Sequence, residues 1–272
     1  MPQNKLVGKV AIITGSSRGI GKAIAIDLAT QGAFIVLNGR NEERLAETKQ
    51  IIEKIHSNVI SVCCDVSIKE SGVALVKAAV DHFGKLDILV NNVGVSSRGT
   101  VAEMSPDVFK TVFDSNLMGS VNPTIPAIPE LRKTKGSLVF ISSLAGIRGL
   151  PFLSPYCASK MALRAVAESI RIEEAKNKIH VGLIFVGITE IEHNKEAIAS
   201  DGTMLVLKSR EGKKVQSSAF VAKKVRNNIL RRKYKTTLTG VGKLNSFMHA
   251  RFPLLVEKII LKTIHKFEEK SE

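Results

Sequence analysis

A tyrosine and a lysine stand four residues apart in the run from Tyr156 to Lys160, directly after Pro155. If this run is helical, the two side chains lie on the same face of the helix. A free tyrosine has a pKa of about 10, too high for easy proton exchange near neutral pH. A lysine ammonium one turn away favours the ionised tyrosine and lowers that pKa. The spacing therefore leaves two interpretations, an ordinary helix surface or a general acid with a tuning cation.

A second candidate for chemistry is the glycine-rich segment TGSSRGIG, residues 14–21, which has glycines at 15, 19 and 21. It follows a continuous apolar run at 9–15, typical of a buried parallel strand, and precedes a helical pattern at 20–32. Glycines in such a turn let backbone N–H groups approach a pyrophosphate, and the helix N-terminus favours the negative charge. Glycine turns also join strands to helices for steric reasons alone, but the position after a first strand indicates a dinucleotide site.

The residue that follows the second strand indicates which dinucleotide is preferred. NAD-binding chains present an acid to the ribose 2′-hydroxyl about twenty residues after the loop, but here the strand ends Asn38-Gly39-Arg40. Arg40 could pair with a 2′-phosphate, and Arg18 in the loop could supply a second guanidinium. The alternative is two solvated surface arginines. The missing acid favours NADP(H).

These residues require a scaffold in which strands and helices alternate. Through residue 190, short β-rich runs alternate with longer amphipathic runs, and SLVFISS at 137–143 is one of the strands. This pattern predicts one doubly wound α/β domain with about seven parallel strands and helices on both faces. We expect the domain to cover 1–240, with a substrate-loop region at 188–215. In the segment with Pro123, Pro126 and Pro129, we expect a helix that begins near Asp107 and is kinked or interrupted near Pro126.

Taken together, the motifs resemble the short-chain dehydrogenase/reductase family from residue 7 to about 240. The resemblance rests on the glycine loop, on residues that follow later strands, and on the Tyr156-x-x-x-Lys160 pair. The other matching residues are Asp65, Asn91, Asn92, Gly94, Asn116 and Ser143, which stands thirteen residues before Tyr156. Two departures are visible: Val93 replaces the usual alanine, and Val186-Gly187-Ile188-Thr189 lacks the usual proline and has an early threonine.

The resemblance implies a catalytic set in which Tyr156 exchanges a proton with the substrate oxygen during hydride transfer. It implies that Ser143 hydrogen-bonds that oxygen, that Lys160 also binds the nicotinamide ribose, and that Asn116 holds a water of the proton relay. A turn serine and a capping asparagine are the alternatives for Ser143 and Asn116. The resemblance and the loop together assign cofactor binding to Gly15, Ser17, Arg18, Gly19, Ile20, Gly21, Arg40, Asp65, Val66, Asn92, Val93, Gly94, Tyr156, Lys160, Gly187, Ile188 and Thr189.

Composition limits the class of protein. Of 272 residues 44% are hydrophobic, and three cysteines form neither a disulfide framework nor a metal pattern, so we expect a cytoplasmic protein without a metal. No signal peptide is apparent, and no apolar stretch reaches the ~18 residues of a membrane-spanning helix. The function predicted is hydride transfer between NADP(H) and a carbonyl or secondary alcohol. The alternatives are a catalytically idle scaffold and, less compatible with the motifs, a nucleic-acid-binding protein.

The C-terminal segment 241–272 is basic and amphipathic. Residues from Asp201 onward contain 17 Lys and Arg against 6 Asp and Glu, so they carry +11 of the net charge of +15. From Pro253 the pattern predicts a helix with a broad apolar side and lysines at 258, 262 and 266. Such a helix suits either an anionic membrane surface, with a lipophilic substrate, or packing against the protein or a second subunit. The resemblance implies a homodimer or homotetramer.

Overall fold

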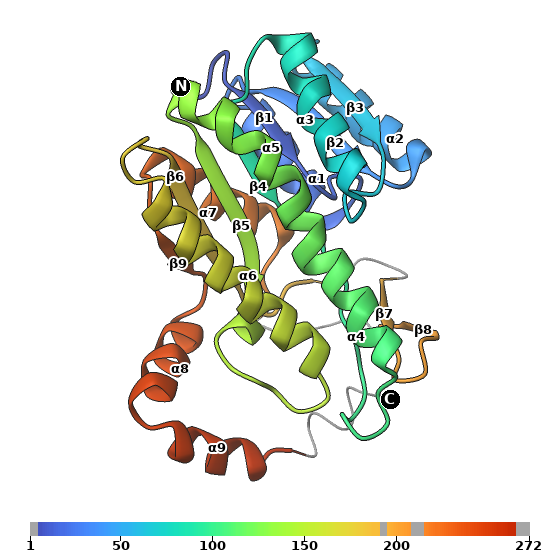
Figure 1. Cartoon of the computed structure of the whole chain (residues 1–272), viewed down its shortest axis with the longest axis vertical. Coiled ribbons are helices and arrows are strands. Elements are labelled where there is room, and N and C mark those ends of the chain that lie inside the picture. Colours follow the sequence, from blue (N-terminus) through green and yellow to red (C-terminus); the bar gives the residue numbers. More distant parts are fainter. Residues whose placement is uncertain (1–4, 191–194, 208–214, 265–272) are drawn as a thin grey trace.

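The computed structural model describes residues 5–190, 195–207 and 215–264. Within them, a seven-stranded parallel sheet forms the centre of the molecule, in the order β3-β2-β1-β4-β5-β6-β9 (Figure 1). The strands are β1 (Val10–Ile13), β2 (Phe34–Gly39), β3 (Val59–Cys63), β4 (Ile88–Asn91), β5 (Ser137–Ser143), β6 (His180–Val186) and β9 (Lys235–Thr237). The predicted doubly wound parallel sheet is confirmed.

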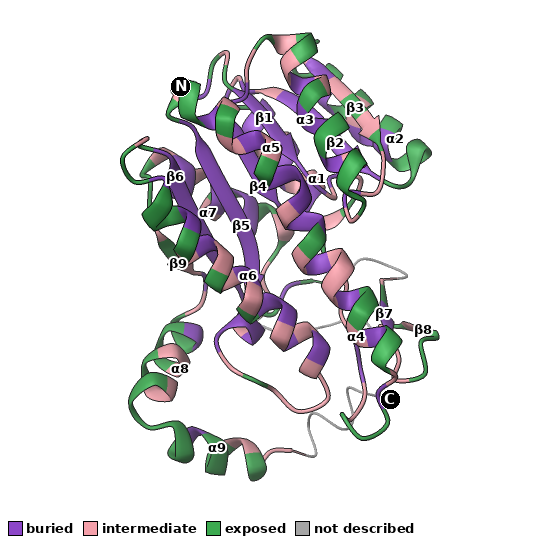
Figure 2. Ribbon diagram, viewed as in Figure 1, coloured by how far each residue is buried: buried purple, intermediate pink, exposed green. Residues whose placement is uncertain are grey.

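Helices cover both faces of this sheet, and each face has its own apolar core (Figure 2). On one face lie α1 (Gly19–Ala29), α2 (Glu42–Glu53) and α7 (Ser218–Leu230). On the other lie α3 (Lys69–Phe83), α5 (Gly119–Thr134) and α6 (Ser154–Glu173). Successive residues of β1 contribute to opposite cores, because Ala11 belongs to the first and Ile12 to the second. Burial on both faces explains why the strands are continuous apolar runs rather than alternating ones.

The proline-rich segment differs from its prediction. A helix does begin near Asp107, as α4 (Pro106–Phe113), but the irregularity is a π-helical turn, η1 (Asp114–Met118). The following α5 is continuous and contains Pro123, Pro126 and Pro129, so the expected interruption near Pro126 is wrong. A proline removes only the bond to the carbonyl four residues earlier. The bonds of the other residues and the packing of α5 against α3 keep the helix continuous.

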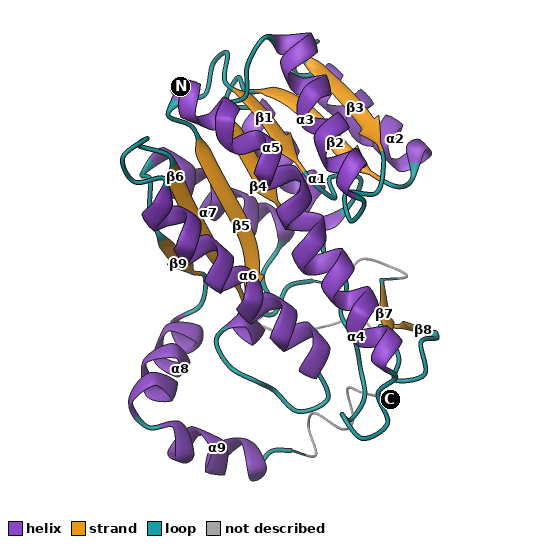
Figure 3. Ribbon diagram, in the orientation of Figure 1, coloured by secondary structure: helices purple, strands orange, loops and turns teal. Residues whose placement is uncertain are grey.

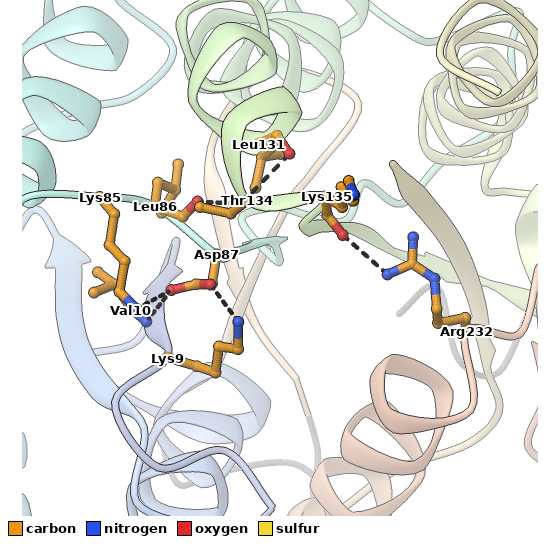
Figure 4. A network of polar contacts seen from close by, with 9 residues as sticks. All are labelled: Lys9, Val10, Lys85, Leu86, Asp87, Leu131, Thr134, Lys135 and Arg232. Carbon is orange, nitrogen blue, oxygen red and sulfur yellow. Dashed lines mark hydrogen bonds and ion pairs between the residues drawn. The ribbon is translucent and has the colours of Figure 1, made fainter. Parts of the chain in front are cut away.

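Buried polar contacts tie the amino ends of the strands together, at the edge of the sheet where Asp87 precedes β4 (Figure 4). The Asp87 carboxylate accepts hydrogen bonds from Lys9 Nζ at 2.8 Å and from the Val10 N–H at 3.0 Å. Lys85 Nζ lies 3.4 Å from the same carboxylate. Nearby, the Thr134 hydroxyl donates to the Leu86 carbonyl at 2.8 Å. These contacts fix the register of the sheet at the edge opposite the strands' carboxyl ends.

Several short elements lie beyond the carboxyl ends of the strands (Figure 3). The 3₁₀ turn η2 (Leu144–Gly146) follows β5, and β7 (Glu196–Ile198) pairs antiparallel with β8 (Met204–Val206) in the substrate-loop region. After β9 come α8 (Gly240–Arg251) and α9 (Pro253–Leu261), which begins at the predicted proline. None of the helices in the described ranges is long and apolar enough to cross a membrane.

Candidate active site

A cavity of about 1150 Å³ opens at the carboxyl ends of the strands and contains most of the predicted site. Ser143, Tyr156 and Lys160 line it together with nearly all the predicted cofactor residues. Two predicted residues are not among those that line it: Ser17, whose hydroxyl faces Gly39, and Asn116. The predicted cofactor residues in its wall are Gly15, Arg18, Gly19, Ile20, Gly21, Arg40, Asp65, Val66, Asn92, Val93, Gly94, Tyr156, Lys160, Gly187, Ile188 and Thr189.

The loop between β1 and α1 has the geometry of a phosphate cradle. Gly15 has a φ of +61°, a conformation that residues with a side chain rarely adopt. A Cβ atom on Gly21 would lie 2.1 Å from the Gly15 carbonyl oxygen, so only glycine fits there. The first turn of α1 contains no acidic residue, and its amide groups can accept a negative charge. These observations fit a dinucleotide pyrophosphate.

Two charged residues stand beside this cradle. Arg40 Nη1 lies 3.3 Å from Asp65 Oδ2, and the Arg40 side chain is 73% exposed. Partial burial raises the pKa of Asp65, but hydrogen bonds from the Ser67 hydroxyl and amide and the charge of Arg40 outweigh it, so the pKa is lowered. Asp65 therefore stays ionised and positions the guanidinium at the rim of the cavity.

The cavity wall also contains Asn38, which was not predicted as a site residue. Its side chain accepts from the Gly15 N–H at 3.5 Å and donates to the Val62 and Cys64 carbonyls, each at 3.2 Å. It thereby joins the glycine loop to the end of β3. A polar residue at the end of an otherwise apolar strand is the signal that could have identified it.

Asn92 and Thr14 form a second connection behind the loop. The Thr14 hydroxyl accepts from the Asn92 N–H at 2.9 Å, and Asn92 Nδ2 donates to the Thr14 and Gly15 carbonyls at 3.0 and 3.1 Å. The side chain of Asn92 thus shapes the loop through its backbone, and the neighbouring Gly94 completes the wall.

Tyr156 and Lys160 lie one turn apart on α6, as the spacing predicts. Lys160 Nζ is 5.9 Å from the centre of the Tyr156 ring and donates to the Ile141 carbonyl at 3.0 Å. Only 4% of Lys160 is exposed. Burial, together with repulsion from Lys195, lowers the pKa of Lys160 to about 8. A buried ammonium beside the tyrosine is the arrangement that a lysine-tuned general acid requires.

Ser143 ends β5 on the opposite side of the cavity. Its hydroxyl oxygen accepts a hydrogen bond from the Ala145 N–H at 3.2 Å, where it caps η2. With that lone pair engaged, the hydroxyl proton can point elsewhere. The neighbouring Ser142 is buried and lies against the Lys160 carbonyl. The structure thus distinguishes the two adjacent serines.

Asn116 lies within the π-helical turn η1 and is fully buried. Its Oδ1 accepts from the Val95 N–H at 2.7 Å, while Nδ2 donates to the Val95 carbonyl at 3.0 Å and to Ser159 Oγ at 2.9 Å. A Cβ atom on Gly94 would lie 2.9 Å from Asn116 Oδ1 and 3.1 Å from Lys160 Nζ. Asn116 therefore stands directly behind Lys160, where it supports the wall.

The segment after β6, which lacks the usual proline, is held by backbone pairing. The Gln216 N–H donates to the Ile188 carbonyl at 2.9 Å, and the Glu190 N–H donates to the Gln216 carbonyl at 3.0 Å. Thr189 is 7% exposed and Ile188 is 47% exposed at the cavity. The pairing fixes residues 187–189 at the cavity wall without the proline.

The outer part of the cavity, beyond Tyr156, is predominantly apolar. Its apolar side chains come from η2, from the loop before α6 and from the β7–β8 hairpin: Leu144, Leu150, Phe152, Leu153, Leu205 and Leu207. Arg98 and Lys195 add cations there. Among the described residues, no group of three His, Cys, Asp or Glu could hold a metal ion.

Comparisons with known proteins agree with this geometry. The family model described as short chain dehydrogenase matches residues 9–202. The 11-beta-hydroxysteroid dehydrogenase 1A of Arabidopsis thaliana is 33% identical over 261 residues, which cover 93% of this chain and 74% of that protein. The 3-dehydrosphinganine reductase of Danio rerio is 37% identical over 187 residues, covering 66% of this chain and 56% of that one.

A solved structure shares the fold. The crystal structure of a metagenomic short-chain oxidoreductase in complex with NADP superposes with a TM-score of 0.71 at 26% identity. The match covers 86% of this chain and 97% of that one.

Proposed function

Because the chain belongs to the short-chain dehydrogenase family, we propose that this oxidoreductase uses NADP(H) to interconvert an apolar carbonyl compound and its secondary alcohol. The observation that carries the proposal is one cavity that contains the glycine cradle and, at its inner end, Ser143, Tyr156 and Lys160. The idle-scaffold alternative finds no support, since the matched relatives are named as enzymes.

NADP(H) would be held along the wall from the glycine loop to residues 187–189, and it would supply or accept the hydride. The amides at the start of α1 suit the pyrophosphate, and Gly21 allows its close approach. Arg40 stands at the rim beside Asp65, and Arg18 caps α1. Two guanidinium groups and no acid in the usual position favour a 2′-phosphate over a 2′-hydroxyl.

Tyr156 would exchange the proton with the substrate oxygen. The ammonium of Lys160 has three N–H donors, of which the Ile141 carbonyl takes one. A second can bind a ribose hydroxyl, while the positive charge stabilises the tyrosinate that forms as the proton leaves. The pKa of Lys160, about 8, keeps this side chain mostly protonated at neutral pH.

Ser143 would donate its hydroxyl hydrogen to the substrate oxygen. The Ala145 N–H occupies one lone pair of Ser143, which leaves the O–H to point toward the cavity. This bond stabilises negative charge that develops on the carbonyl oxygen during reduction. Asn116 keeps the predicted place in a proton relay through its contact region with Lys160, with its side chain held by Val95 and Ser159.

The substrate is proposed to be lipophilic. The outer cavity is lined by leucines and by Phe152, which gain free energy from apolar contact. The names of the two relatives refer to a hydroxysteroid and to 3-dehydrosphinganine, and both are largely apolar compounds. A carbonyl carried by an apolar body would place that body in the outer cavity and its oxygen between Ser143 and Tyr156.

The proposal is tested by following NADPH absorbance with a series of ketones of increasing chain length. We expect catalytic efficiency to rise with apolar length, and NADPH to support higher efficiency than NADH. Absence of turnover on every carbonyl and alcohol tried, with either cofactor, would overturn it.

Assembly is the second part of the proposal. Exposed apolar side chains on α5 and α6 include Ile125, Met161 and Ile172. We propose that this surface forms a homodimer, with the domain at 1–240 as its body. The remaining segment 241–272 is proposed to contact an anionic membrane peripherally.

A further inference from the structure

The two C-terminal helices present an unusual surface. Six large apolar side chains of α8 and α9, which we call the tail face, are between 54% and 71% exposed: Val241, Leu244, Phe247, Leu254, Ile259 and Leu261. In α9 only Val256 is buried. Figure 2 shows both helices as mainly exposed, at the opposite end of the molecule from α2 and α3. Exposed apolar surface of this extent marks an interaction site.

Basic residues interleave with the apolar ones. In α9, Lys258 lies four residues after Leu254 and three before Leu261, so all three share one side of the helix. The charged residues of the described part of α8, α9 and the turn after them are Lys243, Arg251, Lys258 and Lys262 against the single acid Glu257. Lysine stems can lie along an apolar surface while their ammonium groups reach anionic headgroups.

The charge argues against a second copy of the chain as the occupant. A two-fold contact would place the same patch on both sides, so lysines would face lysines. Such like-charge contacts are unfavourable, whereas an anionic surface complements them. A separate apolar surface on α5 and α6 is also present for self-association.

The tail face adjoins the mouth of the catalytic cavity. Asn245 of α8 lines the same cavity as Tyr156. A Cβ atom on Gly242 would lie 2.5 Å from Leu144 Cδ2, so α8 packs tightly against the turn that follows Ser143. A surface that binds α8 would therefore also lie close to the cavity entrance.

We propose that the tail face docks on an anionic lipid bilayer and thereby brings the cavity mouth to the membrane, from which a lipophilic carbonyl compound enters. The docking stands on the tail face alone, while the route of the substrate rests on the proposed function.

Docking is tested by co-sedimentation of the full chain with phosphatidylglycerol-containing vesicles, compared with vesicles of phosphatidylcholine alone. We expect binding only to the anionic vesicles, weakening as salt is added because screening shortens the reach of the charges. Protein that stays in the supernatant at low salt would overturn the proposal.

Two variants separate the contributions. Lys258→Gln with Lys262→Gln removes two charges and should weaken partitioning roughly 30-fold, whereas Leu254→Gln removes apolar contact and should weaken it roughly tenfold. The matched control, Lys54→Gln with Lys69→Gln, removes two charges from exposed positions of the distant α2–α3 end and should bind almost normally. An equal loss in the control would reduce the effect to net charge and overturn the assigned face.

Two further measurements test self-association and substrate delivery separately. Light scattering should give one molar mass for the parent and Leu254→Gln; a lower mass for the variant would make the tail face a contact between copies and overturn the proposal. On a water-soluble ketone, the tail variants should keep full turnover but lose efficiency with a ketone embedded in anionic vesicles. Equal efficiency with the embedded ketone would overturn the delivery route, whereas inactivity of the parent on every substrate would overturn the proposed function and leave the docking result intact.

Discussion

The ammonium group of Lys160 donates a hydrogen bond to the carbonyl oxygen of Ile141 at 3.0 Å, which ties α6 to the carboxyl end of β5. The bond fixes a buried cation beside Tyr156 without neutralising it. Because a carbonyl carries no formal charge, the charge of Lys160 remains available to act on the tyrosine hydroxyl.

Lys195→Gln should raise the pKa of Lys160. Burial is the largest cause of the lowered value of about 8, and repulsion from Lys195 adds to it. Burial remains in the variant, so the pKa should rise only part of the way toward its usual 10.5. Protonated Lys160 supports reduction, so the alkaline limb of the catalytic efficiency should move to higher pH. A pH profile with NADPH checks this, and Lys77→Gln on the distant α3 should leave the limb in place.

Tyr156→Phe should abolish turnover while leaving cofactor affinity nearly unchanged, because only the proton donor is removed. Lys160→Ala should damage both, since the ammonium serves the tyrosine and a ribose hydroxyl. Rates come from nicotinamide absorbance, and affinities come from quenching of protein or enhancement of nicotinamide fluorescence. A Tyr156→Phe protein that retains most of its activity on every substrate would refute the proton-transfer role.

Arg40→Asp should narrow or invert the preference for NADP(H) over NAD(H). Hydrogen bonds to charged groups contribute about 1.5–3 kcal/mol, and the exposure of Arg40 favours the lower end, so we expect roughly a tenfold loss of NADPH affinity. Titration of both cofactors measures it. Arg44→Asp on the exposed side of α2 provides the control, and equal affinities of the parent for both cofactors would contradict the proposal.

Much of the sheet could be predicted from the sequence because both of its faces are buried. Residues such as Ile12 and Phe140 must be apolar whichever face they reach, which produces recognisable runs. The three-residue strands of the β7–β8 hairpin are too short to give such a pattern. The π-helical turn around Asn116 could not be predicted, because the usual helical periodicity does not mark the insertion of one residue.

The site was predictable where function dictates the residue type. Gly21 and the Tyr156–Lys160 spacing follow from steric and chemical requirements that hold in any sequence. Asn38 was missed because its contribution is a contact between two loops, which only the folded chain displays. The exposure of the tail face was likewise invisible, since an apolar stripe predicts burial until the neighbouring elements are placed.

Asp87→Asn should destabilise the fold without altering the catalytic cavity. The carboxylate is 3% exposed and accepts hydrogen bonds from Lys9 and the Val10 N–H (Figure 4), so weakening them should lower the free energy of unfolding by about 2 kcal/mol. Denaturant unfolding measures this. Asp81→Asn breaks an exposed ion pair with Lys77 and should change stability little. Equal stabilities of the two variants would show that the Asp87 contacts contribute nothing.

His180 should make stability depend on pH in the mildly acidic range. Burial lowers its pKa to about 4, while hydrogen-bond contacts with Ser137 and the Lys233 carbonyl hold the ring between β5 and the end of α7. In the unfolded chain the pKa returns to about 6.5, so between these values the unfolded state binds more protons than the folded state. Stability from the neutral ring is therefore fully present above pH ~6.5 and is lost as the pH falls toward ~4, by up to about 3 kcal/mol. Chemical unfolding at several pH values should show this slope, and His180→Gln should flatten it even if the variant is less stable throughout. The exposed His82→Gln is the control and should retain the slope. If His180→Gln keeps the parental pH dependence, other groups cause it and the buried imidazole is not the titrating residue.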